Sequence, residues 1–157
     1  MGSKDVSKAV AGAYSMYGGL FKEVVKEVGM EKALALAAKQ SERESAQMAG
    51  TLKKKLGGKE LDIKTLVAVT EEMMGGSGYT YEIEETPTSL TAKIDKCPLY
   101  EGLKMAGLDD KTIKTMCTRM AKAGNDAIKK QFPKVQTRLK FRASPDGFCT
   151  EEMILRK

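Results

Sequence analysis

The sequence predicts an α+β fold, with a helical N-terminal half followed by a β-hairpin, two helices and a second β-hairpin. Apolar residues recur at helical spacing in five segments, and they alternate with polar residues in four others. Because like segments are grouped, we expect a four-stranded antiparallel sheet covered by helices. The length of 157 residues fits a single domain over 1–157, with a helical segment at 1–76 and a cysteine-bearing α+β segment at 77–157.

Three helices are expected in the first half of the chain. Apolar residues three or four positions apart over 14–28 predict the first helix. The second helix is expected over 30–56, where its very polar stretch at 41–47 should be exposed to solvent. Asp62 is suitably placed to cap the third helix, which the glycines of 75–78 end.

The second half combines two short apolar-polar hairpins with two helices. The expected elements are strands over 79–84 and 90–95, helices over 98–107 and 109–132, and strands over 135–142 and 148–155. Pro98 suits the first position of a helix, and Asp109 is a suitable N-cap. The last two strands are joined at 144–147, where proline stands second and glycine fourth, as type I turns prefer.

The chain has three cysteines and no histidine. An odd count with wide spacing argues against structural disulfides, so we expect a reducing, cytoplasmic compartment. The lack of histidine excludes Ser-His and Cys-His couples, histidine-ligated zinc and a histidine general base. Any chemistry must therefore use thiol, carboxylate, amine or phenol groups.

The three cysteines lie on three different predicted elements. Cys97 precedes the Cys-Pro helix start, Cys117 lies inside a helix, and Cys149 follows an Asp-Gly turn. From this topology we expect three thiolates that converge to bind zinc or an iron–sulfur cluster, or to supply a nucleophile. Cys97 should be the most ionised, because a helix N-terminus and Lys96 both favour the thiolate. The alternative is that each cysteine is a small buried core residue, since no short C-x-x-C pair is present.

Polar side chains near the last cysteine add candidate groups. Glu151 lies two positions after Cys149, so the two share a strand face, and the carboxyl group could serve as base, acid or ligand. A solvated strand end is the alternative. One face of the preceding strand is largely cationic and could bind anions, although a solvated face is the default; it comprises Lys134, Gln136, Arg138, Lys140 and Arg142.

Charge and hydropathy narrow the class of partner. The formal charge of +6 is moderately basic, but the sequence has neither an RNA-binding sheet signature nor a glycine-rich phosphate loop. No apolar stretch approaches the roughly 20 residues that a bilayer span requires. We therefore expect a small-molecule ligand or substrate as partner, rather than nucleic acid or a membrane.

Three segments resemble a known family. The sequence reads K-C-P-L-Y-E-G-L-K at 96–104, M-C-T-R-M at 116–120, and P-K-V-Q-T-R-L-K-F-R-A-S-P-D-G-F-C-T-E at 133–151. These segments resemble the L-2-amino-thiazoline-4-carboxylic acid hydrolase-like family, in which Cys-Pro opens a helix, a second cysteine follows, and a third comes after a turn in the last strand. The resemblance is close over 96–151, whereas the helical half is similar in layout.

The resemblance implies a small-molecule activity. It implies that a cyclic thiazoline amidine is opened to N-carbamoyl-cysteine, on an architecture related to 4-vinyl reductase-type small-molecule-binding domains. The matching positions Cys97, Cys117 and Cys149 would form the centre, with one metal coordination position open. Glu151 is then the candidate general base, and Arg138 or Arg142 the candidate anchor for a substrate carboxylate. These candidate site residues are Cys97 and Glu151 as catalytic, Arg138 and Arg142 as substrate-binding, and Cys97, Cys117 and Cys149 as metal-binding.

Two other functions compete with the hydrolase hypothesis. The chain could be a non-catalytic sensor or carrier that binds a small hydrophobic or sulfur-containing molecule. It could also be a scaffold in which the two long N-terminal helices form a homodimer and the cysteines are merely buried. Turnover separates the first alternative from the hydrolase, and the metal content of a Cys97→Ser variant tests the second.

Overall fold

The computed structural model of the chain describes residues 3–144 and 146–156, and its α+β architecture confirms the predicted fold class. The outermost positions of the predicted domain and Pro145 of the predicted turn lie outside the described residues. In chain order, the elements are α1 (Ser3–Val28), α2 (Met30–Leu56), α3 (Ile63–Gly76), β1 (Thr80–Glu85), β2 (Ser89–Lys96), α4 (Pro98–Met105), α5 (Asp110–Gln131), β3 (Val135–Lys140) and β4 (Cys149–Leu155).

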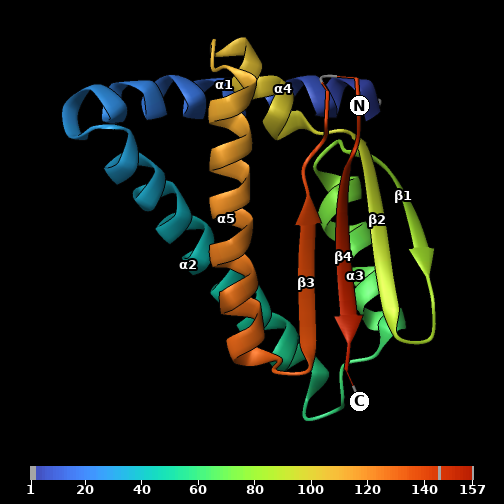
Figure 1. The fold of residues 1–157 in the computed structure, drawn as a ribbon. Coiled ribbons are helices and arrows are strands. Elements are labelled where there is room, and N and C mark those ends of the chain that lie inside the picture. The colour runs from blue at the N-terminus through green and yellow to red at the C-terminus, as the bar shows by residue number, and fades with distance from the viewer. Residues whose placement is uncertain (1–2, 145, 157) are drawn as a thin grey trace.

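The four strands form one antiparallel sheet in the order β1-β2-β4-β3. Two hairpins, β1–β2 and β3–β4, are thus joined by the pairing of β2 with β4. Helix α3 covers one face of the sheet and lies behind it in Figure 1. Helix α5 runs beside β3. Helix α1 crosses one end of the sheet, with α4 beneath it. The inner face, toward α3, carries Leu90, Ala92 and Ile94 of β2, which are all buried.

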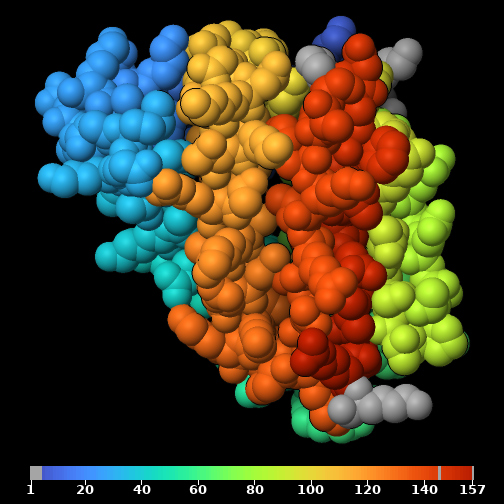
Figure 2. Space-filling view, in the orientation of Figure 1, coloured from blue at the N-terminus to red at the C-terminus, as the bar shows by residue number. Residues whose placement is uncertain are grey.

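The opposite face of the sheet lies at the molecular surface. Figure 2 shows β2, β3 and β4 exposed on this side, with α5 alongside. Charged side chains are paired across neighbouring strands here: Lys93 lies 3.7 Å from Glu82, and Arg138 lies 3.7 Å from Glu152. Such exposed ion pairs add little stability, but they keep this face polar.

The predicted exposure of the 41–47 segment is wrong for its serines. Helix α2 packs along α5, and both Ser41 and Ser45 are partly buried in this contact. The Ser41 hydroxyl donates a hydrogen bond to the Met120 carbonyl at 3.0 Å, and the Ser45 hydroxyl fills the space where Gly124 lacks a side chain. Ser41 can be buried here because its hydroxyl is bonded to the partner helix, and the small volume of both serines allows close approach.

The helix starts follow the capping residues that the sequence indicates. The Asp62 carboxylate accepts a hydrogen bond from the Thr65 amide at 2.8 Å, and Asp109 accepts one from Thr112 at 2.7 Å. Helix α1 begins at Ser3, well before the apolar stripe that predicted it. Within the described residues, no helix is long and apolar enough to cross a membrane.

The apolar interior divides into two clusters that meet at the end of β2. The first core cluster contains Phe21, Ala33, Leu34, Ala37, Tyr100, Leu103, Leu108, Ile113 and Met116, and lies among the helices. The second core cluster contains Met74, Ala92, Ile94 and Cys149, and lies between α3 and the sheet. Cys97 packs against both clusters, so it marks the junction between the helical layer and the sheet.

Candidate functional site

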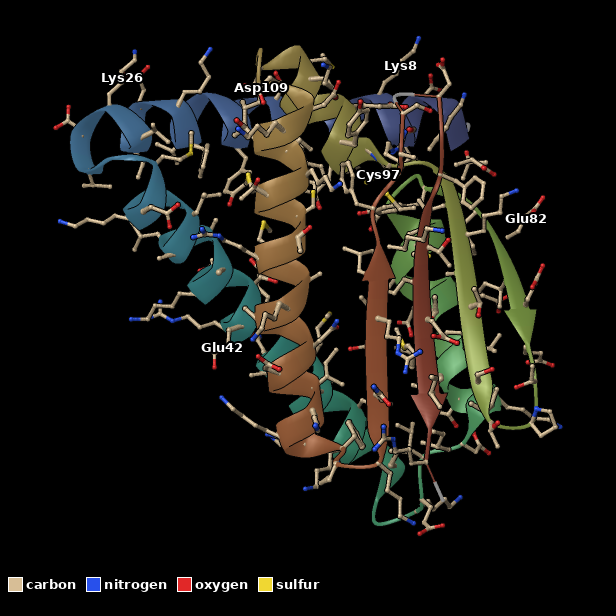
Figure 3. All side chains as sticks on the ribbon, viewed as in Figure 1. Lys8, Lys26, Glu42, Glu82, Cys97 and Asp109 are labelled. Carbon is tan, nitrogen blue, oxygen red and sulfur yellow. The ribbon has the colours of Figure 1, made fainter. Side chains whose placement is uncertain are left out.

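Cys97 connects the end of β2 to the start of α4. It is the N-cap residue of α4, with extended backbone angles, and Pro98 follows as the first helical residue. Figure 3 shows Cys97 near the end of the sheet, below α1. The side chain is partly buried, and the amides of the first turn of α4 are directed toward the side of the helix on which it lies.

Cys149 and Glu151 lie on the inner face of the central strand β4. The register pairs Cys149 with Ile94 and Glu151 with Ala92, two buried residues of β2. On its other side, Glu151 pairs with Leu139 of β3. The carboxyl group is therefore inserted into an apolar row of the sheet.

Cys117 lies on α5 and packs against the first core cluster. Burial raises the pKa of its thiol to about 12, with smaller contributions from Cys97 and Cys149, while the guanidinium of Arg142 acts in the opposite direction. A thiol with this pKa is protonated at neutral pH. Cys117 therefore has the character of a core residue.

The three cysteines do not form the expected ligand set. All three are free thiols. Across residues 3–144 and 146–156, no three Cys, Asp or Glu side chains lie close enough together to hold a metal ion. The three thiols lie on different elements. They are near enough to influence one another's pKa values, but they do not surround a common position. These side chains therefore do not fit a zinc ion or an iron–sulfur cluster.

The expectation that Cys97 is readily ionised is also wrong. Burial raises the pKa of the Cys97 thiol, and this effect exceeds the opposing influence of the Tyr100 and Leu99 amides and of the Tyr79 hydroxyl. Lys96 is exposed and does not enter the site. The helix terminus thus reduces, without cancelling, the cost of removing the thiolate from water.

Two phenols that the sequence analysis did not single out lie beside Cys97. Tyr79 and Cys97 pack against the same core cluster, and burial raises the pKa of the Tyr79 and Tyr14 phenols, with a smaller contribution from Cys97 to each. The hairpin register contains the signal: Thr80 pairs with Lys96, so the residues that adjoin this pair, Tyr79 and Cys97, lie at the same end of the hairpin. We name this group the thiol–phenol cluster, comprising Tyr14, Tyr79, Cys97, Cys149 and Glu151.

The two candidate arginines lie in different places. Arg138 points to the outer face of the sheet, where it pairs with Glu152. Strand β3 ends at Lys140, and Arg142 turns inward beyond it, buried, with its guanidinium 4.4 Å from the centre of the Tyr100 ring and one amino group 3.2 Å from the Asp95 carbonyl oxygen. The predicted continuous cationic face therefore does not include Arg142.

Comparison with known families identifies the sequence family of the chain. The sequence model of L-2-amino-thiazoline-4-carboxylic acid hydrolase matches residues 10–143. The chain belongs to this family. The match includes most of the helical half, for which only a similarity in layout was expected from the sequence. Comparisons with curated proteins and with solved structures found no match.

The segment matched to the thiazoline carboxylate hydrolase family contains only part of the thiol–phenol cluster. Cys97 and both tyrosines lie within the match, whereas Cys149 and Glu151 lie beyond residue 143. Strand β4 nevertheless lies at the centre of the sheet and brings these two residues to the matched part. The relation to 4-vinyl reductase-type domains stays a prediction.

The chemistry available to this hydrolase-family chain is that of a partly buried thiol, Cys97, and a desolvated carboxyl group, Glu151, which both lie on the inner side of the sheet. The carboxyl group of Glu151 is surrounded by protein atoms, although the residue as a whole remains partly exposed, and desolvation raises its pKa. A carboxyl group in this environment holds its proton to higher pH and can donate it to a leaving group. Cys97 offers a nucleophile.

Proposed function

We propose that this protein hydrolyses a small cyclic amidine of the thiazoline type, opening the ring to an N-carbamoyl thiol, at the thiol–phenol cluster. The observation that supports the proposal is that the helix N-terminal thiol Cys97 packs against the second core cluster, which contains Cys149, while Glu151 lies two residues further along the same face of β4, in a chain of this hydrolase family. Cys97 could provide the nucleophile and Glu151 the proton donor that ring opening needs.

The chain has no histidine and the raised pKa of Glu151 favours its protonated form, so we assign the role of base in the first step to the substrate. An amidine nitrogen is basic enough to accept the Cys97 proton, which gives a thiolate beside an amidinium ion. The sulfur then attacks the amidine carbon, the ring carbon–sulfur bond breaks, and Glu151 donates its proton to the departing ring sulfur. An opposite charge in a buried site lowers the energy of the thiolate, so the raised pKa of the free enzyme's thiol does not prevent this step.

Water completes the reaction in the second step. The Glu151 carboxylate takes a proton from a water molecule, whose oxygen attacks the carbon now bound to Cys97. As the carbonyl of the product forms, the bond between that carbon and the Cys97 sulfur breaks, the added hydroxyl group returns its proton to that sulfur, and the N-carbamoyl thiol product leaves. Glu151 is protonated again at the end, so the cycle consumes one water molecule and no other reactant.

Arg142 is the proposed anchor for a carboxylate on the substrate. Its guanidinium is buried near Tyr100 at the junction of sheet and helices, where a charge-assisted contact would be strong. Arg138 is exposed on the other face and pairs with Glu152, so we assign it no substrate contact.

The test is ring opening of 2-aminothiazoline-4-carboxylate, followed by the release of a free thiol. We expect Cys97→Ser to lose turnover and Glu151→Gln to lower kcat by between about a hundredfold and ten-thousandfold. Cys117→Ser is the matched control, because it alters a buried thiol outside the cluster and should retain turnover. Equal activity of wild type and the folded Cys97→Ser protein would contradict the proposal.

A non-catalytic binding protein is the second candidate. The specific observation in its favour is that burial raises the pKa of Cys97 and Cys117, as is typical of unreactive thiols. Under this hypothesis the wild-type protein binds 2-aminothiazoline-4-carboxylate but leaves the ring intact over hours. Calorimetric titration together with the thiol-release assay separates the two functions.

No step above requires a metal ion. Binding of zinc or an iron–sulfur cluster stays a prediction that the placement of the described Cys, Asp and Glu side chains does not support. A cytoplasmic location and the pairing of two copies likewise stay predictions from the sequence.

A further inference from the structure

We infer that Tyr100 is a positioning residue for the substrate anchor: its ring holds the Arg142 guanidinium beside Cys97, so that a carboxylate bound there lies next to the nucleophile. The role of Tyr100 in catalysis rests on the proposed function. The contact between ring and guanidinium belongs to the fold itself, and it can be tested without any substrate.

Arg142 contacts the chain on both sides of Cys97. One amino group of its guanidinium donates a hydrogen bond to the carbonyl oxygen of Asp95, shortly before the cysteine, at 3.2 Å. The guanidinium carbon lies 4.4 Å from the centre of the Tyr100 ring, shortly after the cysteine. The guanidinium is thereby held at the junction of β2 and α4, where Cys97 is the N-cap.

The Tyr100 ring is itself held by several neighbours. Its hydroxyl donates a hydrogen bond to the Asp110 carboxylate at 2.7 Å, and the same carboxylate oxygen lies 3.3 Å from the Lys104 amino group. The ring of Phe141 lies 6.3 Å from the Tyr100 ring, centre to centre, at an angle of 59°. Because α4, the start of α5 and the segment after β3 all contribute, the buried Tyr100 ring has little freedom to turn away from the guanidinium.

The first turn of α4 connects the nucleophile to this ring. The Cys97 carbonyl accepts a hydrogen bond from the Glu101 amide at 3.0 Å, and Pro98 restricts the backbone at the first helical position. The separation between Cys97 and Tyr100 is therefore set by a helical turn and not by a flexible loop. A carboxylate bound to Arg142 would be held at a fixed distance from the thiol, and such positioning accelerates a reaction between bound groups.

These contacts suit a cation that has to receive a substrate carboxylate. An aromatic ring and a backbone carbonyl are uncharged, so they hold the guanidinium in place without cancelling its charge. A carboxylate in the place of the ring would compete with the substrate. The Asp110 carboxylate is instead engaged by the Tyr100 hydroxyl and by Lys104.

The substrate-free test is an NMR measurement on Arg142. A guanidinium held over an aromatic ring has its Nε proton signal shifted upfield by the ring current, and the signal is assigned by its loss in Arg142→Lys. We expect Tyr100→Phe to keep this shift, because the ring remains, and Tyr100→Leu to lose it. The same signal position in wild type and in folded Tyr100→Leu would overturn the inference.

The second test compares 2-aminothiazoline-4-carboxylate with 2-aminothiazoline, which lacks the carboxylate. The carboxylate preference is the ratio of the two kcat/KM values, and a variant that is merely less stable loses activity on both compounds without changing this ratio. We expect Tyr100→Leu to lower the preference by between about threefold and thirtyfold, the range of a cation–π contact. The change should come mainly from a higher KM for the carboxylated compound. Tyr100→Phe should retain most of the preference.

Tyr81→Leu is the matched control. Tyr81 is also a partly buried phenol, but it lies on β1 and packs against the second core cluster, so its loss should leave the carboxylate preference unchanged. Arg142→Gln should abolish the preference. Adding Tyr100→Leu to Arg142→Gln should then lower it no further, because the ring acts through the guanidinium.

The outcomes separate this inference from the proposed function. If the wild type opens neither ring, calorimetric titration measures the preference from the two dissociation constants; the same losses would then support the positioning role and contradict the hydrolase. Opening of both rings at equal kcat/KM would support the hydrolase and overturn the inference, since Arg142 then holds no carboxylate. An equal effect of Tyr100→Leu with and without Arg142 would also overturn it. A wild type that neither binds nor opens either compound would contradict both.

Discussion

At the residue scale, Glu151 makes stability depend on pH. Its carboxyl group is desolvated among apolar neighbours, so its pKa in the folded protein lies above the ordinary value of 4.5. Folding then favours the protonated form. The contribution of Glu151 to the free energy of unfolding should therefore be largest below pH 4.5 and should fall as the pH rises from 4.5 through the raised pKa, where the folded protein must either keep the proton or bury a charge.

Urea unfolding at pH 5 and pH 8 tests this prediction. Glu151→Gln carries no titrating group, so its unfolding free energy should fall less between the two pH values than that of wild type. Glu152→Gln is the control, because the adjacent carboxylate faces the outer side of the sheet beside Arg138. The ordinary pKa of 9.0 for cysteine lies above this range, so the thiols contribute little to the difference. An equal fall in wild type and Glu151→Gln would contradict the prediction.

The sequence predicted the location of Cys97 better than its protonation. The Cys-Pro dipeptide correctly indicated a helix start, because proline suits the first helical position whatever surrounds it. Whether a thiol is ionised depends instead on how much water remains around it, and the neighbours that exclude this water come from α1, α5 and the sheet. Tyr79 was missed for a related reason, since its packing with Cys97 is set by the tertiary fold and not by a motif.

At the element scale, the contact between α1 and α4 depends on a glycine. A Cβ on Gly102 would overlap the Ala11 carbonyl oxygen, the Tyr14 Cβ and the Ser15 amide nitrogen. Gly102→Ala should therefore force the two helices apart and destabilise the protein by about 1–3 kcal/mol, the usual range for overpacking a core.

Gly19→Ala provides the control for the helix contact. Gly19 also lies in a helix, on α1, but nothing stands within 4 Å of the place where its Cβ would be. Alanine favours a helix over glycine by up to about 1 kcal/mol, so this variant should be neutral or more stable. Urea unfolding measures the stability of the Gly102→Ala and Gly19→Ala variants. A Gly102→Ala protein as stable as Gly19→Ala would show that α1 and α4 are not closely packed.

Element boundaries were predicted well where local chemistry decides them. Helix α2 spans Met30–Leu56 as expected, because glycines flank it on both sides. Strand β3 ends at Lys140, two residues earlier than the alternation suggested, since Arg142 is drawn inward to the Asp95 carbonyl and the Tyr100 ring. The alternating pattern alone does not contain that tertiary contact.

At the scale of the whole molecule, the sequence predicted two hairpins and their antiparallel sheet but not the junction between them. Strands β2 and β4 are separated along the chain by α4, α5 and β3, so no local period specifies that they pair. That pairing nevertheless builds the candidate site, because it places Cys149 and Glu151 opposite Ile94 and Ala92. The most consequential contact in the fold is thus the one with the largest sequence separation between strands.

The central position of β4 in the sheet predicts that folding requires the part of the chain beyond the family match. A chain ending after Ala143 would contain all of the matched residues but would lack β4. Strands β2 and β3 would then each lose their shared partner, and Leu90, Ala92 and Ile94 would lose the strand beside them. Because backbone groups exposed in this way remain unpaired at the centre of the sheet, we expect no cooperative unfolding transition.

A chain ending after Leu155 is the control, since it retains all of β4 and lacks only the final contacts, such as the hydrogen bond from the Arg156 amide to the Lys134 carbonyl. Circular dichroism followed during urea unfolding should give a sigmoidal transition for this chain and a gradual, featureless change for the 1–143 chain. A sharp transition in the shorter chain would mean that β2 and β3 can pair directly. The site would then be assembled on a sheet that folds without it, and Cys149 and Glu151 would be additions to a complete fold rather than part of its centre.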